Sequence, residues 1–174
     1  VEVDPDPSAA PPQNVDDNLY RLMVLSVLLE SNDADLAPLK RYLRRDGPAL
    51  SRLSCRRAWN LADRFGLLIR DYEYARQDAL IQPWLQNKLG LSDRTREPME
   101  RAQRALFQAI IREPDGKRAL LGQDGKTFKT FPQYAMERLT SPTPPRQTNG
   151  LVHFFGFTEI SALHARVINW LAQC

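Results

Sequence analysis

The sequence predicts a mainly α, compact helical domain with a small β-hairpin or short strands in its C-terminal half. Apolar residues recur at spacings of three and four along most of the chain, which is the period of an amphipathic helix. Hydrophobic residues make up 43% of the 174 residues, enough to bury a sizeable core. Asp124 and Gly125 lie between two short alternating apolar arms, and Asp-Gly there is the strongest short hairpin signal. The β element is expected near 119–131, with a further strand near 151–157.

Two regions are expected along the chain. Residues 1–14 contain four prolines and few large apolar groups, so they are expected to form a disordered acidic tail or linker. Residues 15–174 are expected to form a single mainly helical domain with a sub-boundary near 92–96. The longest apolar run, 22–29, is far shorter than the roughly 20 residues of a membrane span. The acidic, proline-rich start lacks the features of a signal peptide and predicts a fragment or a processed form.

Three helices are predicted in the first half of the chain. The first, 15–30, is apolar on nearly every side of its second half, as a helix in the middle of a core is. The second, 35–46, starts at an aspartate, a residue type that caps helices well. The third, 55–65, follows a serine cap and is expected to end at Gly66, since glycine commonly follows the last turn of a helix. The pattern at 67–69 fits either a helix or a strand.

The second half of the chain repeats the helical period. Residues 72–91 are expected to form a helix that breaks before Pro83. Residues 97–113 are expected to form an amphipathic helix, and Glu97 with Glu100 fits the negative charge favoured at a helix start. Shorter helices are expected at 131–139 and from residue 158 to the end of the chain.

The basic charge is concentrated in one stretch of the sequence. The whole chain has a net charge of +3, but residues 1–36 contain eight acids and one base. Residues 37–76 contain ten bases and four acids, a net charge of +6. Such clustering attracts polyanions, which include nucleic acid, acidic protein and anionic lipid.

The order of elements in 35–70 is similar to that of bacterial helix-turn-helix domains. In the predicted helix 55–65, one face carries the small and apolar residues that would pack inward: Ala58, Leu61, Ala62 and Phe65. Another face carries Arg56, Asn60 and Arg64, with Arg57 beside them. Arginine and asparagine suit the edges of guanine and adenine. Further basic residues are candidates for neutralising phosphates: Lys40, Arg41, Arg44, Arg45 and Arg52.

These observations predict a non-enzymatic module that binds DNA through the helix-turn-helix-like segment 35–70. A solvated helix face beside a core explains the same pattern. The alternative function is protein–protein interaction, as an adaptor or a secreted-effector domain of a larger protein, with an acidic protein as partner. One feature departs from a standard winged helix, because no glycine-rich hairpin directly follows Leu68.

The sequence contains no recognised catalytic motif. Phosphate-binding glycine loops, GxSxG and HExxH do not occur, so no enzyme activity, cofactor or metal is expected. Cys55 is followed by Arg56 and Arg57, but a nucleophile also needs a base, and the only histidines are His153 and His164. An unrecognised enzyme centred on these residues is a third hypothesis. With Cys174 as the only other cysteine, a cytoplasmic or other reducing compartment is expected, and signal-independent export stays open.

Overall fold

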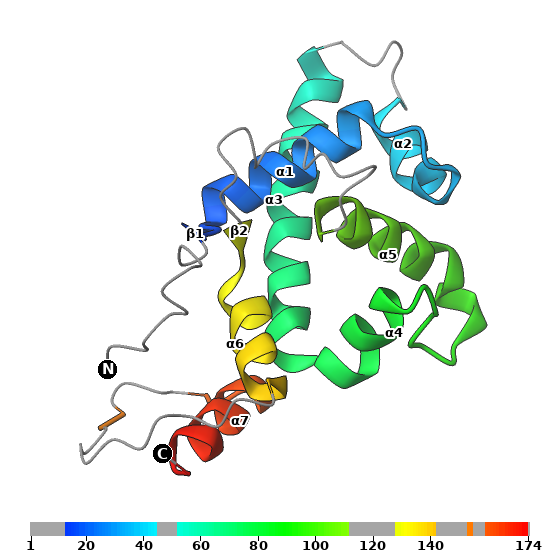
Figure 1. Cartoon of the computed structure of the whole chain (residues 1–174). Helices are drawn as coiled ribbons and strands as arrows, with labels where there is room; N and C mark the ends of the chain where they lie inside the picture. The colour runs from blue at the N-terminus through cyan, green and yellow to red at the C-terminus, as the bar shows by residue number, and fades with distance from the viewer. Residues whose placement is uncertain (1–12, 45–51, 112–127, 142–152, 155–158, 174) are drawn as a thin grey trace.

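The computed structural model of the chain describes residues 13–44, 52–111, 128–141, 153–154 and 159–173. The described residues form seven α-helices joined by short 3-10 and π-helical turns, so the predicted mainly α class is confirmed. The long helix α3 (Arg52–Ala75) runs through the middle of the molecule, with α1 (Asp17–Glu30) crossing it near one end and α7 (Ala162–Leu171) beside the other (Figure 1).

The third helix is longer than the sequence predicted. Gly66 was expected to end it, yet α3 continues without interruption to Ala75. Gly66 is buried where α1 crosses, and a methyl group built on it would lie 3.8 Å from the Cα of Arg21 and from Cδ1 of Tyr20. Close packing against α1 therefore outweighs the roughly 1 kcal/mol by which glycine disfavours a helix. The open choice at 67–69 is decided in favour of helix.

A 3-10 turn and a short helix follow α1. The turn η1 (Ala34–Leu36) begins at Asp33, whose carboxylate accepts a hydrogen bond of 2.8 Å from the amide of Asp35. The helix α2 (Ala37–Leu43) continues directly from it and buries its two leucines at 39 and 43. The predicted end of this helix and the turn after it fall in residues 45–51, which lie outside the described residues.

The helix that was expected to break before Pro83 changes there from a π-helical turn to an α-helix. After α3, residues Gln77–Ile81 form a π-helical turn, η2, and α4 (Gln82–Leu85) follows with Pro83 in its first turn. Proline is tolerated there because its missing N–H would have no helical partner. The 3-10 turn η3 (Arg94–Arg96) then leads into α5 (Glu97–Ile111), the amphipathic helix that the sequence predicted.

Glu100 has a different role from the one predicted. Both Glu97 and Glu100 lie in the first turn of α5, as expected, and Glu97 is exposed and forms an ion pair with Arg101 at 2.6 Å. The side chain of Glu100 is buried and accepts hydrogen bonds from Trp84 and from the loop between α4 and η3. The sequence pattern could not show this, because the donors lie 9–16 residues away along the chain.

The β structure among the described residues is not a hairpin. Strand β1 (Gln13–Asn14) pairs in parallel with strand β2 (Phe128–Lys129). Regular structure therefore begins within residues 1–14, which were expected to form a disordered tail. The Asp-Gly turn of the predicted hairpin lies outside the described residues. So does most of the predicted strand at 151–157, of which His153 and Phe154 are described without regular structure. The helix α6 (Phe131–Thr140) follows β2 directly.

One apolar core joins the helices. It is centred on Trp84, Phe107, Leu106, Val24 and Ile69, all of them fully buried, and contains side chains of α1 to α5. No helix in the described part of the chain has the length and apolar character needed to cross a lipid bilayer.

Candidate functional site

The residues predicted to read DNA do lie on one face of α3. Arg56, Asn60 and Arg64 are exposed, whereas Ala58, Ala62 and Phe65 are buried in the core. This division follows from the four-residue spacing along a regular helix. Leu61 is partly buried and packs against the core. The turn of the predicted helix-turn-helix-like segment falls in residues 45–51, outside the described residues, and the helix after it, α3, has 24 residues instead of the short helix 55–65 that was expected.

The other predicted basic residues are placed unevenly. Arg41, Arg44 and Arg52 are exposed, and Arg45 lies outside the described residues. Lys40 donates a hydrogen bond to the carbonyl of Ser31, which directs its ammonium group back toward the end of α1. The guanidinium of Arg57 lies over the ring of Tyr42 at 5.9 Å, linking α3 to α2.

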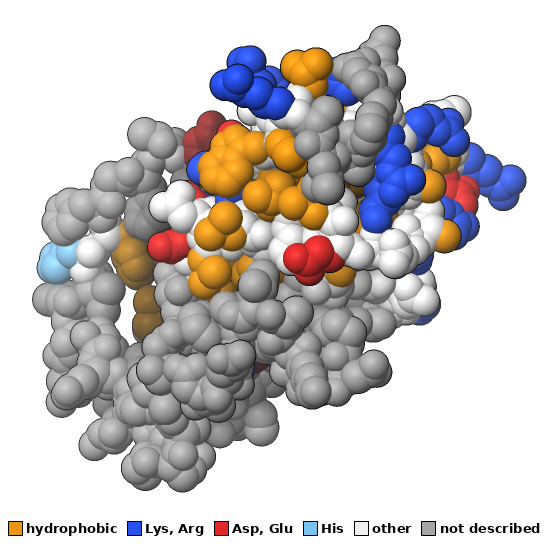
Figure 2. Space-filling view, turned by 90° about the horizontal axis from the view of Figure 1, so that it is seen from above, with side chains coloured by type: hydrophobic (Ala, Val, Ile, Leu, Met, Phe, Trp, Pro, Cys, Tyr) orange, Lys and Arg blue, Asp and Glu red, His pale blue; other side chains and the backbone are white. Residues whose placement is uncertain are grey.

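The basic side chains of the described residues gather in more than one place. Figure 2 looks down on the molecule from above, and Lys and Arg side chains gather at the top and at the right of that view. Apolar side chains lie below the upper group. The exposed apolar residues of α1 and of the first half of α3 include Leu22, Leu29, Leu53 and Trp59, with 45–59% of each residue accessible.

His164 forms no dyad with Cys55. Cys55 is exposed near the start of α3, whereas His164 on α7 lies against Tyr74, with ring centroids 5.3 Å apart. Tyr74 follows Cys55 by nineteen positions on the same helix, a separation of about 28 Å at roughly 1.5 Å per residue. His164 instead completes a capping box with Ser161. Among the described residues there is no group of three or more His, Cys, Asp or Glu that could hold a metal ion.

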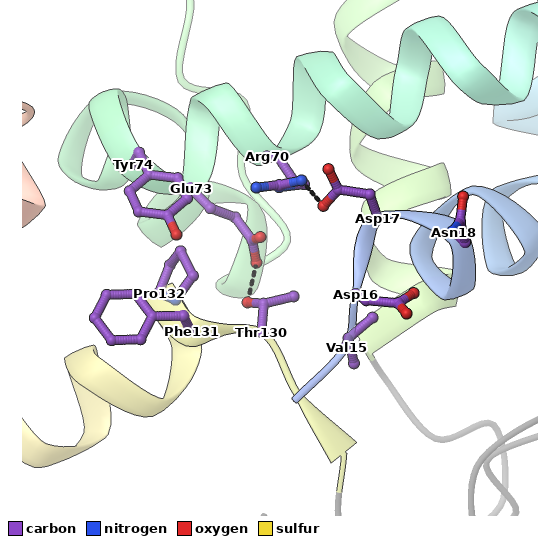
Figure 3. Close-up of a pocket in the computed structure, with 10 residues that line it drawn as sticks. All are labelled: Val15, Asp16, Asp17, Asn18, Arg70, Glu73, Tyr74, Thr130, Phe131 and Pro132. Atoms are coloured by element: carbon purple, nitrogen blue, oxygen red, sulfur yellow. Dashed lines mark hydrogen bonds and ion pairs between the residues drawn. The ribbon is translucent and has the colours of Figure 1, made fainter. Parts of the chain in front are cut away.

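The structure reveals a pocket that no sequence pattern indicated. It lies where the start of α1, the second half of α3 and the start of α6 meet, and it has a volume of about 310 Å³ (Figure 3). Residues 15–18 line one side and residues 130–132 another, and α3 contributes Arg70, Glu73 and Tyr74. We call it the Glu73 pocket. Its three walls come from segments more than 50 residues apart, so no local signal could have marked it.

Glu73 is the unusual residue of this pocket, because only 1% of its surface is accessible. Its Oε1 accepts hydrogen bonds from the hydroxyl of Thr130 at 3.1 Å and from the side-chain amide of Gln133 at 3.0 Å. Its Oε2 has no hydrogen-bond partner among the described residues. Burial raises the pKa of Glu73 to about 7, although the two hydrogen bonds and the nearby Arg70 act to lower it.

The surroundings of Glu73 are acidic overall. Asp16 caps α1 by accepting a hydrogen bond of 2.7 Å from the amide of Leu19, and Asp17 forms an ion pair with Arg70. The hydroxyl of Tyr20, also on α1, is buried and has no hydrogen-bond partner in the described part of the chain. Burial raises the pKa of Tyr20 well above its ordinary value, and the charge of Glu73 adds to that effect.

The described residues define a mainly helical domain that carries basic groups on its surface and a small acidic pocket. Residues 5–174 match the family described as RecC, N-terminal domain, and the chain belongs to that family. RecC is a subunit of the RecBCD DNA-repair helicase/nuclease complex. No curated protein and no solved structure gives a match.

Family membership corrects the predicted function. The chain was predicted to be a non-enzymatic module that binds DNA by itself through a helix-turn-helix-like segment. This prediction is wrong, because the family of the chain belongs to one subunit of a large enzyme complex. The coarser expectation of nucleic-acid and protein partners agrees with that family, since RecC works with RecB and RecD and binds DNA. The predicted function was wrong because it was inferred only from the charge and the order of helices in residues 35–70.

Proposed function

We propose that this chain is the N-terminal domain of a RecC-type subunit and works inside a DNA-repair helicase/nuclease complex. The observation that carries the proposal is the family match, which extends over residues 5–174 and so includes every described element. In this role the domain helps to build the complex and supplies no catalytic group of its own. Support for the second part is the lack of a nucleophile–base pair around Cys55 in the described part of the chain.

The exposed arginines of α3 are proposed to add electrostatic attraction for DNA within that complex. Arg56 and Arg64 are exposed on one face of a helix whose other side is fixed in the core, so their positions are well defined. Contacts of this kind act mainly on phosphates, because exposed arginines attract the charged nucleic-acid backbone whatever its sequence.

The test uses the whole RecC-type subunit, co-expressed with its RecB and RecD partners. Arg56 and Arg64 are changed together to Ala, and co-purification and DNA affinity are measured over a range of salt concentrations. The complex is expected to assemble normally. Its DNA affinity should fall several-fold at low salt, and the slope of log affinity against log salt should decrease by about 2, because two phosphates are no longer neutralised.

The matched control changes Arg94 and Arg96 together to Ala. Both are exposed in η3, away from the face of α3, and the change in net charge is the same. If the two double variants lower DNA affinity equally, the arginines of α3 contribute only through the net charge of the domain. Failure of the wild-type subunit to co-purify with RecB and RecD would overturn the proposal as a whole.

A further inference from the structure

The Glu73 pocket contains an acceptor that needs a donor. Oε2 of Glu73 is buried and has no hydrogen-bond partner among the described residues, and leaving such an atom unsatisfied destabilises the fold. Figure 3 shows the carboxylate in the middle of the labelled residues, between α3 and the start of α6. Oε1 already accepts hydrogen bonds from Thr130 and Gln133, so Oε2 is the oxygen that still lacks a donor.

We propose that the Glu73 pocket binds a guanidinium group, which donates a hydrogen bond to Oε2 of Glu73 and lies beside the aromatic rings of Tyr74 and Phe131. The pocket lies at the C-terminal half of α3, whereas Arg56 lies near its N-terminal end. The inference does not depend on the role proposed for the domain.

The charges around the pocket favour a cation. Three carboxylates line it, from Asp16, Asp17 and Glu73, against the single guanidinium of Arg70. Arg70 is held by its ion pair with Asp17, which leaves the negative charge of Glu73 without a direct ionic partner among the described residues. A second cation therefore adds an attraction that the pocket lacks.

Two helix starts also face the pocket, and their positive ends would by themselves favour an anion. Both are capped by side chains, however. The carboxylate of Asp16 caps α1, and α6 begins with a capping box in which the side chains of Thr130 and Gln133 accept hydrogen bonds from each other's backbone amides. Because these amides are already used, the helix starts offer little to an anion, and the acceptor on Glu73 decides the preference.

The shape of the guanidinium group suits the aromatic wall. The rings of Tyr74 and Phe131 stack with centroids 6.4 Å apart and an angle of 19° between their planes. Phe131 is 44% exposed, so one side of this stack is accessible. A planar guanidinium stacks on aromatic faces and is more weakly hydrated than an ammonium, which makes it the better cation for such a site. A volume of about 310 Å³ is sufficient for one such group.

Binding should depend on pH because protons compete for Glu73. The charged and titratable groups facing it are Asp16, Asp17 and the buried Tyr20 from α1 and Arg70 from α3. From α6 and the residue before it come only the neutral side chains at 133 and 130. Burial raises the pKa of Glu73 to about 7, so most of the carboxyl is protonated at pH 6 and ionised at pH 8. Affinity for a cation should therefore be about tenfold higher at pH 8 than at pH 6.

The experiment is an NMR titration of the 174-residue chain with methylguanidinium, and methylammonium serves as the comparison cation. We expect saturable shifts of the amides of Glu73, Thr130 and Gln133, with a Kd of about 1–10 mM for so small a probe. Methylammonium should bind several-fold more weakly. A short peptide with one central arginine separates the two sources of the group: tighter binding than methylguanidinium indicates a protein side chain, and equal binding indicates a free guanidino compound.

Glu73→Gln should reduce methylguanidinium affinity at least tenfold, since an amide N–H then replaces the unsatisfied acceptor. The control is Glu137→Gln, which removes an exposed carboxylate on α6 that pairs with Lys129 outside the pocket. That variant should bind as the wild type does. If Glu73→Gln does not fold, the pH dependence of the wild type and a several-fold loss in Phe131→Leu test the same site. No saturable shift at pH 8, or equal binding at pH 6 and pH 8, overturns the proposal.

Discussion

The indole Nε1 of Trp84 donates a hydrogen bond of 3.0 Å to Oε1 of Glu100, and both side chains are almost completely buried. The same carboxylate accepts backbone hydrogen bonds from Gly90 at 2.5 Å and from Leu91 at 3.2 Å. One carboxylate on α5 therefore fixes both the ring at the centre of the core and the loop that follows α4. Hydrogen bonds to a charged acceptor are among the stronger ones in proteins.

Replacing Glu100 by Ala should destabilise the domain strongly. The change leaves an indole N–H and two backbone amides without their acceptor, and the expected loss is about 2–5 kcal/mol in the free energy of unfolding. Urea denaturation measures this directly. Glu97→Ala is the control on the same helix, because that carboxylate is exposed and its removal should leave the urea midpoint unchanged within error. Equal losses from the two variants would contradict the role given to Glu100.

Two glycines should respond in opposite ways to the same substitution. A methyl group at position 90 would lie 1.9 Å from the carbonyl oxygen of Ala79, so Gly90→Ala must displace backbone and should cost about 1–3 kcal/mol or more. At Gly66 the nearest atoms are 3.8 Å away and the residue lies inside α3, so Gly66→Ala should stabilise by about 0.5–1 kcal/mol. Thermal melts of both variants check the pair, and a destabilised Gly66→Ala would mean that the packing against α1 is tighter than it is in the structure.

Removing the hydroxyl of Tyr20 should not harm the fold. The oxygen is buried without a hydrogen-bond partner among the described residues, so its desolvation is not offset. Tyr20→Phe keeps the ring that packs against Gly66 and is expected to leave stability unchanged or to raise it by up to about 1 kcal/mol. A loss above about 1 kcal/mol in urea denaturation would show that the hydroxyl is hydrogen-bonded in solution.

Glu73 should make the domain less stable as pH rises from about 5 to 8. Its pKa is about 7 in the folded chain against 4.5 for an ordinary glutamate, so the folded state holds a proton that the unfolded state has released. Stability falls wherever the folded state binds more protons, and a difference of about 2.5 pKa units corresponds to about 3 kcal/mol across this window. Urea midpoints at pH 5 and pH 8 measure the effect, and Glu73→Gln should remove it. If Glu73→Gln shows the same pH dependence of stability as the wild type, other titratable groups cause that dependence.

The sequence by itself determined the mainly helical class and most of the helices. In the first half of α3, apolar residues three and four positions apart fall on one face, and Ala58, Ala62 and Phe65 on that face are buried as predicted. Periodicity of this kind is reliable because it depends only on neighbours within two turns of the same helix. The exposure of Arg56 and Arg64 followed from the same rule.

Tertiary structure alone decided where the helices end, which charged groups are buried and where a ligand could bind. Gly66 continues a helix because α1 packs on it, although its local preference is to end one. Glu100 anchors a loop, and Glu73 meets Thr130 from 57 positions away along the chain. Contacts at that separation depend on how whole helices pack, and no pattern within a few residues of Glu73 or Thr130 contains that information.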